Sequence, residues 1–97
     1  MHKIIVKPLA ESDTEEAANW YNDKVEGLGN EFLLALDAKL NAIRRNPNQF
    51  QIIYKQVRRA IIERFPYAIF YVIEGNIVYI VAVVHTRRNP RLWKKRK

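Results

Sequence analysis

The spacing of apolar and polar residues predicts a short strand and then a helix at the start of the chain. Residues 3–7 (Lys-Ile-Ile-Val-Lys) favour a strand, which Pro8 ends because it lacks the N–H that a continuing ladder needs. A helix is predicted from Ser12 to about residue 26, since Ser12 and Glu15 form a capping box and Gly27 is a natural stop. The acidic residues expected at the positive end of this helix are Asp13, Glu15 and Glu16.

A second helix is predicted from Gly29 or Asn30 to the Asn46-Pro47 pair, which cannot continue it. Its apolar residues recur at helical spacing and form one stripe. Only residues 27–29 separate the two helices, so an antiparallel hairpin is expected. The stripe consists of Phe32, Leu33, Leu36, Leu40 and Ile43.

The second half of the chain predicts strands. Residues 48–56 are expected to be irregular, residues 57–65 and 68–73 alternate as strands, and Gly75-Asn76 suits a tight hairpin turn. The unbroken apolar run in residues 77–85 indicates a central strand buried on both faces. The expected fold is therefore α+β in the order β-α-α-β-β-β, with the helix hairpin on one face of a mainly antiparallel four-stranded sheet.

One face of this sheet has no predicted cover. The strands carry apolar residues on both faces, and two helices can cover only one. We favour an exposed apolar patch with a basic rim, which would be the footprint of a protein partner. The alternative is that the C-terminal tail folds back and places Leu92 and Trp93 on that face.

Composition narrows the class of protein. The 97 residues are 48% hydrophobic, which predicts one packed domain over residues 1–97. The absence of Cys excludes disulfides and thiolate metal sites, and two His residues without clustered ligands predict no metal or cofactor. The apolar runs are too short for a signal peptide or a bilayer span, so we expect a soluble cytoplasmic protein.

Charge is distributed unevenly along the chain. The net charge is +7, and the tail of residues 87–97 contains seven basic and no acidic residues. Residues 1–37 instead contain three basic and eight acidic residues. The basic tail favours an anionic partner, either nucleic acid or an acidic protein segment, although it could equally serve only solubility.

Three local patterns, in this order and spacing, resemble the RelE/ParE superfamily of toxins along nearly the whole chain. They are residues 28–33 at the start of the second helix, residues 46–50 followed by 57–58 and 64–71, and residues 82–90 with Trp93 after them. The last pattern is similar to the His-x-x-Arg-Asp-Pro-x-x-Trp ending of the ParE-like branch, with Asn89 in place of Asp.

The resemblance implies the toxin of a bacterial type II toxin–antitoxin system. Such a toxin is neutralised by a cognate antitoxin, whose C-terminal, often acidic segment folds on it. ParE-like members inhibit DNA gyrase, and RelE-like members cleave messenger RNA on the ribosome. The basic tail agrees with an acidic antitoxin, and we expect its binding residues to be Arg87, Arg88, Arg91, Trp93, Lys94 and Lys95.

Ribonuclease chemistry would need a base, an acid and a cation near the cleaved phosphate. The candidates for these catalytic roles are Arg58 and Arg64, expected on one strand face, and His85. Each also has a structural interpretation, as a solvated strand charge or a cap of the strand end. RelE-like nucleases tend to end with a catalytic Tyr, whereas here Thr86 follows His85 and no Tyr lies beyond Tyr79.

We therefore place gyrase inhibition ahead of messenger RNA cleavage, which leaves it open whether the protein is an enzyme. A non-toxic nucleic-acid-binding module is a further alternative, because the basic tail alone would support it.

Overall fold

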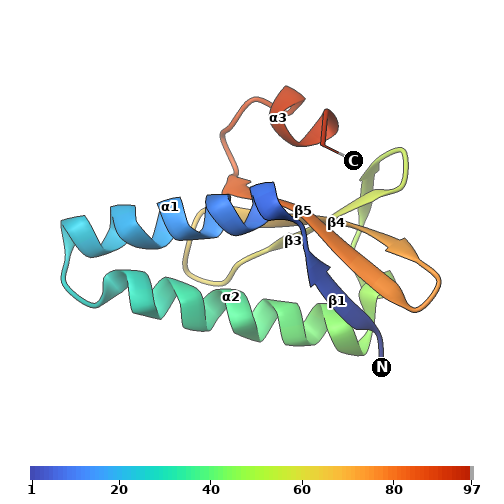
Figure 1. Cartoon of the computed structure of the whole chain (residues 1–97), viewed down its shortest axis with the longest axis horizontal. Helices are drawn as coiled ribbons and strands as arrows, with labels where there is room; N and C mark the ends of the chain where they lie inside the picture. Colours follow the sequence, from blue (N-terminus) through green and yellow to red (C-terminus); the bar gives the residue numbers. More distant parts are fainter. Residues whose placement is uncertain (97) are drawn as a thin grey trace.

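The fold is a five-stranded mixed sheet with a helix hairpin on one face and the C-terminal segment on the other (Figure 1). It is seen in a computed structural model, which describes residues 1–96; Lys97, the end of the predicted basic tail, lies outside the described residues. The elements are β1 (Lys3–Val6), α1 (Pro8–Lys24), α2 (Leu28–Arg45), the 3-10 helix η1 (Pro47–Gln49), β2 (Ile52–Tyr54), β3 (Val57–Ile61), β4 (Tyr67–Glu74), β5 (Ile77–His85) and α3 (Arg91–Lys94).

The strand order is β1-β5-β4-β3-β2, with β1 parallel to β5 and every other pair antiparallel. The α+β class is confirmed, but the sheet has five strands rather than four. The added strand, β2, lies inside residues 48–56, which were expected to be irregular. It is three residues long and pairs irregularly with β3, so it is too short to show a strand period. The prediction of β5 as an internal strand buried on both faces is confirmed.

The first helix begins at Pro8, so the predicted capping box at Ser12 and Glu15 is wrong. Pro8 occupies the first turn, where its missing N–H would have no partner, and Lys7 precedes it without a side-chain cap. Ala10, which precedes the predicted capping residues, is fully buried. Tertiary packing therefore stabilises helical residues that come before the start predicted from the sequence. Asp13 is then inside the helix and available for another contact.

The antiparallel helix hairpin is confirmed, and Gly29 explains how closely its two helices approach. A Cβ at Gly29 would lie 2.2 Å from the Ala18 carbonyl oxygen, so no side chain fits there. The Gly29 N–H also donates a hydrogen bond to Asn22 Oδ1 at 2.7 Å. Beneath the hairpin, the rings of Tyr21 and Phe32 pack on Phe65 at centroid distances of 5.0 and 5.4 Å.

Leu36 lies in the core between α2 and the sheet, with 5% of its surface exposed. Leu36→Ala is expected to lower the free energy of unfolding by about 2–5 kcal/mol, because it removes buried methyl groups and leaves a cavity. Leu34→Ala is the matched control, since Leu34 is on the same helix but 70% exposed, and its effect should stay within about 0.5 kcal/mol. Urea unfolding of both variants is the measurement, and equal losses would contradict this core.

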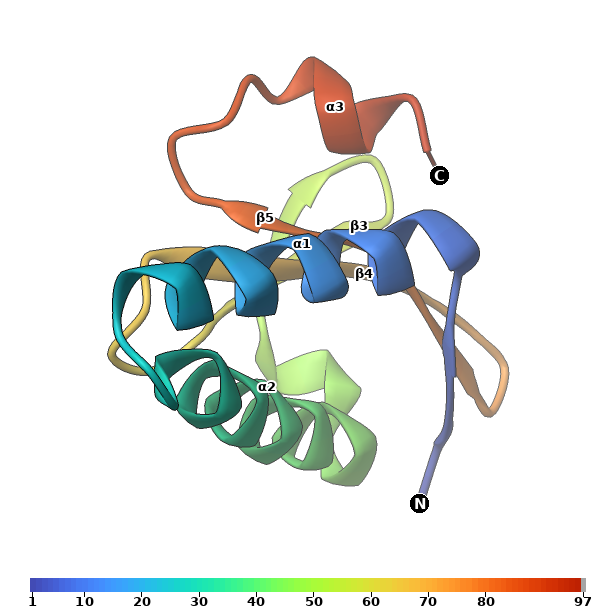
Figure 2. The ribbon, with the colours of Figure 1, turned by 60° about the vertical axis from the view of Figure 1, so that its left-hand side comes forward.

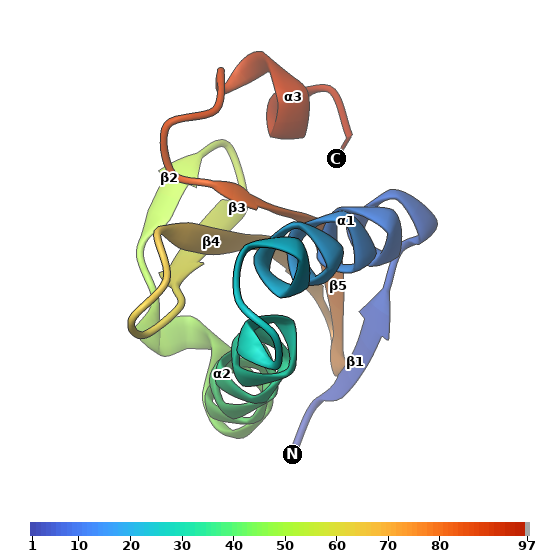
Figure 3. The same cartoon turned by 90° about the vertical axis from the view of Figure 1, so that its left-hand side faces the viewer.

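The C-terminal segment covers the second face of the sheet. Figures 2 and 3 show α3 on the opposite side of the strands from α2. The Trp93 ring stacks on Phe70 at a centroid distance of 4.6 Å and is only 7% exposed. The favoured prediction of an open apolar patch is therefore wrong, and the alternative of a folded-back tail is confirmed. The covered residues are Val57, Ala68, Phe70, Val81, Ala82 and Val84.

No helix in the described part of the chain is long and apolar enough to cross a membrane.

Candidate functional site

The C-terminal segment carries several exposed cations close together in the chain. Pro66 O accepts a hydrogen bond from the Thr86 N–H, and Asn89 Oδ1 accepts one from the Arg91 N–H at 2.9 Å. Asn89 therefore supplies the side-chain oxygen that an Asp would supply at the start of α3. We call the exposed cations of this segment the basic rim: Arg87, Arg88, Arg91, Lys94 and Lys95. Within residues 1–96, none of them forms an ion pair.

Trp93 was predicted as a binding residue, but it does not belong to this exposed surface. Its ring is stacked on Phe70, and the edge of Tyr54 from β2 packs against it at 5.9 Å. Trp93 therefore lies between the basic rim and the sheet and holds the rim against the strands. The rim is held on a folded scaffold rather than on a loose tail.

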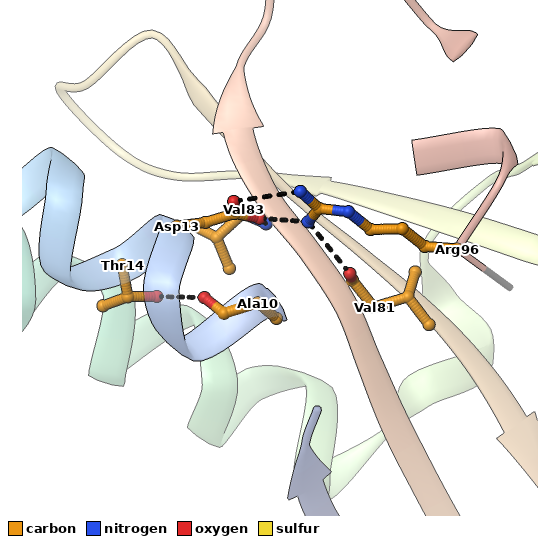
Figure 4. Close-up of polar contacts among 6 residues, drawn as sticks. All are labelled: Ala10, Asp13, Thr14, Val81, Val83 and Arg96. Carbon is orange, nitrogen blue, oxygen red and sulfur yellow. Dashed lines mark hydrogen bonds and ion pairs between the residues drawn. The ribbon is translucent and has the colours of Figure 1, made fainter. Parts of the chain in front are cut away.

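An ion pair between Asp13 and Arg96 holds the other end of this segment, and we call it the latch (Figure 4). Asp13 Oδ1 accepts from Arg96 Nη2 at 3.2 Å, and a second contact joins Asp13 Oδ2 to Arg96 Nη1. Both side chains are largely buried. The two residues are 83 positions apart, so no local pattern in the sequence could have indicated the pair.

The latch lies where strand β5 loses its neighbour. β1 pairs with β5 only as far as Ile80, and no strand of the described residues 1–96 lies beside the β5 edge beyond that point. The Val83 N–H instead donates to Asp13 Oδ2 at 3.0 Å, and Arg96 Nη1 donates to the Val81 carbonyl at 3.3 Å. Two side chains therefore satisfy backbone groups that would otherwise be buried without partners.

Arg58, the first catalytic candidate, holds a backbone turn. Its Nη1 donates to the carbonyl oxygens of Phe50 at 2.6 Å and Asn48 at 3.1 Å. These contacts fix the connection between η1 and β2, which gives the guanidinium a structural role.

Arg64, the second candidate, lies outside the strand. β3 ends at Ile61, and Arg64 has a φ of 70° in the turn before β4. Its guanidinium is exposed and lies 3.5 Å from Glu31 on α2. The predicted strand face shared by Arg58 and Arg64 is therefore wrong.

His85, the third candidate, ends β5 as predicted. Its Nδ1 accepts a hydrogen bond from the Arg87 N–H at 3.1 Å, and its ring packs against Tyr67 at 5.5 Å. His85 is opposite Tyr67 on β4, whereas Arg58 is opposite Tyr71, so about 13 Å of strand separates the two positions. The sheet does not bring the three catalytic candidates together.

Tyr71 links β4 to the same turn that Arg58 holds. Its hydroxyl donates to the Pro47 carbonyl at 2.7 Å. Burial raises the pKa of Tyr71 to about 12, although the nearby Arg58 acts in the opposite direction. Since the folded pKa lies above the unfolded value of 10.0, the neutral hydroxyl stabilises the fold fully below pH 10 and progressively less towards pH 12.

Tyr71→Phe tests this assignment. Below pH 10 the variant should be less stable by about 0.5–1.5 kcal/mol, the usual contribution of one hydrogen bond. The difference from the parent protein should shrink as the pH rises to 12, because only the parent loses this stabilisation. Burial also raises the pKa values of Tyr21 and Tyr67, but both proteins retain these groups, so their effects cancel. Urea unfolding over this pH range is the measurement, and a constant difference would contradict the assignment.

Among residues 1–96, no three His, Asp or Glu side chains are grouped as ligands for a metal ion.

Comparison with known proteins identifies the class. The model of the family described as "ParE toxin of type II toxin-antitoxin system, parDE" matches residues 4–90, which leaves α3 outside the match. A solved structure described as "Chromosomal ParDE TA system from P. aeruginosa" has a TM-score of 0.78 and 15% sequence identity, covering 88% of this chain and 96% of that chain. At that identity the likeness concerns the fold. No curated protein matches in sequence. The family match extends from β1 to the residues just before α3, and on that ground the chain belongs to the ParE family, the toxins of type II toxin–antitoxin systems.

Proposed function

We propose that this toxin acts by binding a protein target, DNA gyrase, through the basic rim, and that an acidic segment of its antitoxin neutralises it by binding the same cations. A toxin of this family has a cognate antitoxin as a partner. The gyrase target rests on the ParE-like resemblance, and the acidic nature of the antitoxin segment rests on the charge of the toxin. Both partners act in the cytoplasm, where we therefore place the toxin.

The observation that carries the proposal is the uncompensated charge of the basic rim. Its cations lie on one short segment that Trp93 and the latch hold against the sheet. A fixed surface of one sign attracts a partner of the other sign at long range, and salt should weaken the association. Preorganisation also reduces the conformational entropy that binding would otherwise cost.

The nuclease alternative has weaker support. Arg58 is engaged with backbone carbonyls, and Arg64 lies beside Glu31 on another part of the surface. His85 has arginines after it, and arginine is a poor general acid or base because it stays protonated at neutral pH. Binding through exposed cations requires none of these residues to transfer a proton.

Two assays run on the same preparations separate the mechanisms. Purified toxin is added to DNA gyrase in a supercoiling assay and to translating ribosomes, whose messenger RNA is then mapped for cuts. We expect inhibition of supercoiling and no cuts. The Arg87→Gln/Arg88→Gln variant should inhibit gyrase at least about tenfold less well, whereas Arg45→Gln, an exposed cation at the end of α2, should behave as the parent.

Cuts at codon positions that disappear in His85→Ala or Arg58→Ala would reverse this order and make the protein a ribosome-dependent nuclease. If neither assay responds and the toxin binds only nucleic acid, the third alternative, a nucleic-acid-binding module, replaces both.

A further inference from the structure

A cavity of about 600 Å³ opens between α1 and the C-terminal end of β5, and the two latch residues also line it. Aromatic rings line it in a continuous row. The ring of Tyr21 lies 5.1 Å from Trp20 and 5.9 Å from Tyr67 between centroids. Tyr67 in turn contacts His85 at 5.5 Å. Clefts of this size are typical of ligand sites and accommodate a large side chain with its neighbours.

Trp20 is the unusual member of this row because it is 54% exposed. The other tryptophan of the chain, Trp93, is buried. The Lys24 ammonium lies 5.1 Å from the Trp20 ring centroid, which is a surface contact that an incoming group can displace. An exposed Trp beside a cavity is characteristic of the centre of a protein interface, where Trp is enriched among the residues that dominate affinity.

Charges of opposite sign border the aromatic row. Glu16 lines the cavity from α1 and Arg88 lines it from the C-terminal segment, and neither has an ion-pair partner within residues 1–96. Burial raises the pKa of Tyr67, Arg88 lowers it, and Asp13 and Glu16 raise it, so these charges all act on the Tyr67 hydroxyl. The cavity therefore offers a row of aromatic rings, a hydrogen-bond acceptor on Glu16 and a cation on Arg88.

We propose that this cavity receives a Trp or Tyr side chain that anchors an acidic antitoxin segment on the toxin, an inference that rests on the proposed function above. The anchor ring packs on Trp20 and Tyr67, and its N–H or O–H donates to Glu16. Carboxylates next to the anchor in the partner reach Arg88 and then Arg87 on the basic rim. Aromatic anchors with one polar atom suit such a site, because the ring is buried while the donor is satisfied.

A nucleobase is the other group that could stack here, and the charge of α1 argues against it. The wall opposite Arg88 carries Asp13 and Glu16. A nucleic acid strand carries a phosphate at every step and would bring some of them close to these carboxylates. A peptide can keep its acidic residues on the side that faces the rim.

The test uses the full chain and two synthetic probes. One probe is a blocked peptide with a single Trp flanked on both sides by Glu residues, and the other has Ala in place of that Trp. Calorimetry gives the affinities, and the Trp20 indole N–H resonance reports contact with the cavity. We expect binding to weaken at least about tenfold with the Ala probe and, for the Trp probe, in Trp20→Ala. Val25→Ala, which removes an exposed apolar side chain just after α1, should leave the affinity unchanged.

The remaining outcomes distinguish this proposal from the proposed function. Equal binding of both probes that is lost in Arg87→Gln/Arg88→Gln would overturn the anchor and leave the acidic partner standing. No binding of either probe would overturn both. A single-stranded oligonucleotide that shifts the Trp20 indole resonance, when neither peptide does, would assign the cavity to nucleic acid instead. Because one comparison changes only the probe, a variant that fails to fold does not decide the result.

Discussion

Asp13→Ala is expected to lower the free energy of unfolding by about 3–5 kcal/mol, the cost of breaking a buried ion pair. The variant leaves the Arg96 guanidinium largely buried without its carboxylate, and it also removes the acceptor of the Val83 N–H. Domains of this size are stable by only about 5–15 kcal/mol in total, so this loss is a large share of the free energy of unfolding. Urea unfolding followed by circular dichroism measures the loss.

Two controls distinguish a loss of the Asp13–Arg96 ion pair from a general effect of substitution on α1. Ser12→Ala changes the exposed neighbour of Asp13 and should alter stability by less than about 0.5 kcal/mol. A double-mutant cycle with Arg96→Ala should give a coupling energy of about 1–3 kcal/mol, because each substitution alone leaves the other partner unpaired. A loss under about 1 kcal/mol in Asp13→Ala would mean that water screens the pair and that the latch does not stabilise the tail.

Trp93→Ala is expected to lower the free energy of unfolding by a similar amount, about 3–5 kcal/mol. The substitution removes the ring that stacks on Phe70 and exposes the apolar face of the sheet beneath α3. An exposed face of this kind also promotes association between copies, so the variant should aggregate at lower concentrations than the parent. Urea unfolding and light scattering measure the two effects.

Lys95→Ala is the matched control, since this exposed neighbour should affect stability by less than about 0.5 kcal/mol. A stable, monodisperse Trp93→Ala variant would show that the tail does not close the core.

The stabilising role of Trp93 also limits how antitoxin binding can be tested. Deleting residues 91–97 would remove Trp93 and Arg96 together with part of the basic rim, so lost binding could not be separated from lost folding. Charge-only substitutions such as Arg87→Gln avoid that ambiguity.

Features set by neighbours in the chain could be predicted from the sequence alone. The Gly27-Leu28-Gly29 segment determines the helix hairpin, and Gly75, with a φ of 62°, occupies the predicted turn between β4 and β5. The apolar run of β5 indicated a strand covered on both faces, since only burial favours so many consecutive apolar side chains. The toxin family also followed from short patterns, because they lie within continuous segments of the chain.

Only the tertiary structure decided where these segments meet. β2 exists because β3 provides a ladder for three residues that show no strand period of their own. The end of β3 at Ile61 moved Arg64 off the strand and separated it from Arg58, although their spacing alone suggested a common face. Strand length depends on pairing partners, which lie elsewhere in the chain.

In the candidate site, too, some features could be predicted from the sequence and others depended on the tertiary structure. The sequence determined that residues 87–97 are basic, and it allowed either an open apolar face or a folded-back tail. The choice between them depends on the contact of Trp93 with Phe70 on β4, and on the contact of Arg96 with Asp13 near the other end of the chain. Such contacts form because the β5 edge beyond β1 and the apolar face of the sheet both need cover, and that need arises only once the strands have assembled.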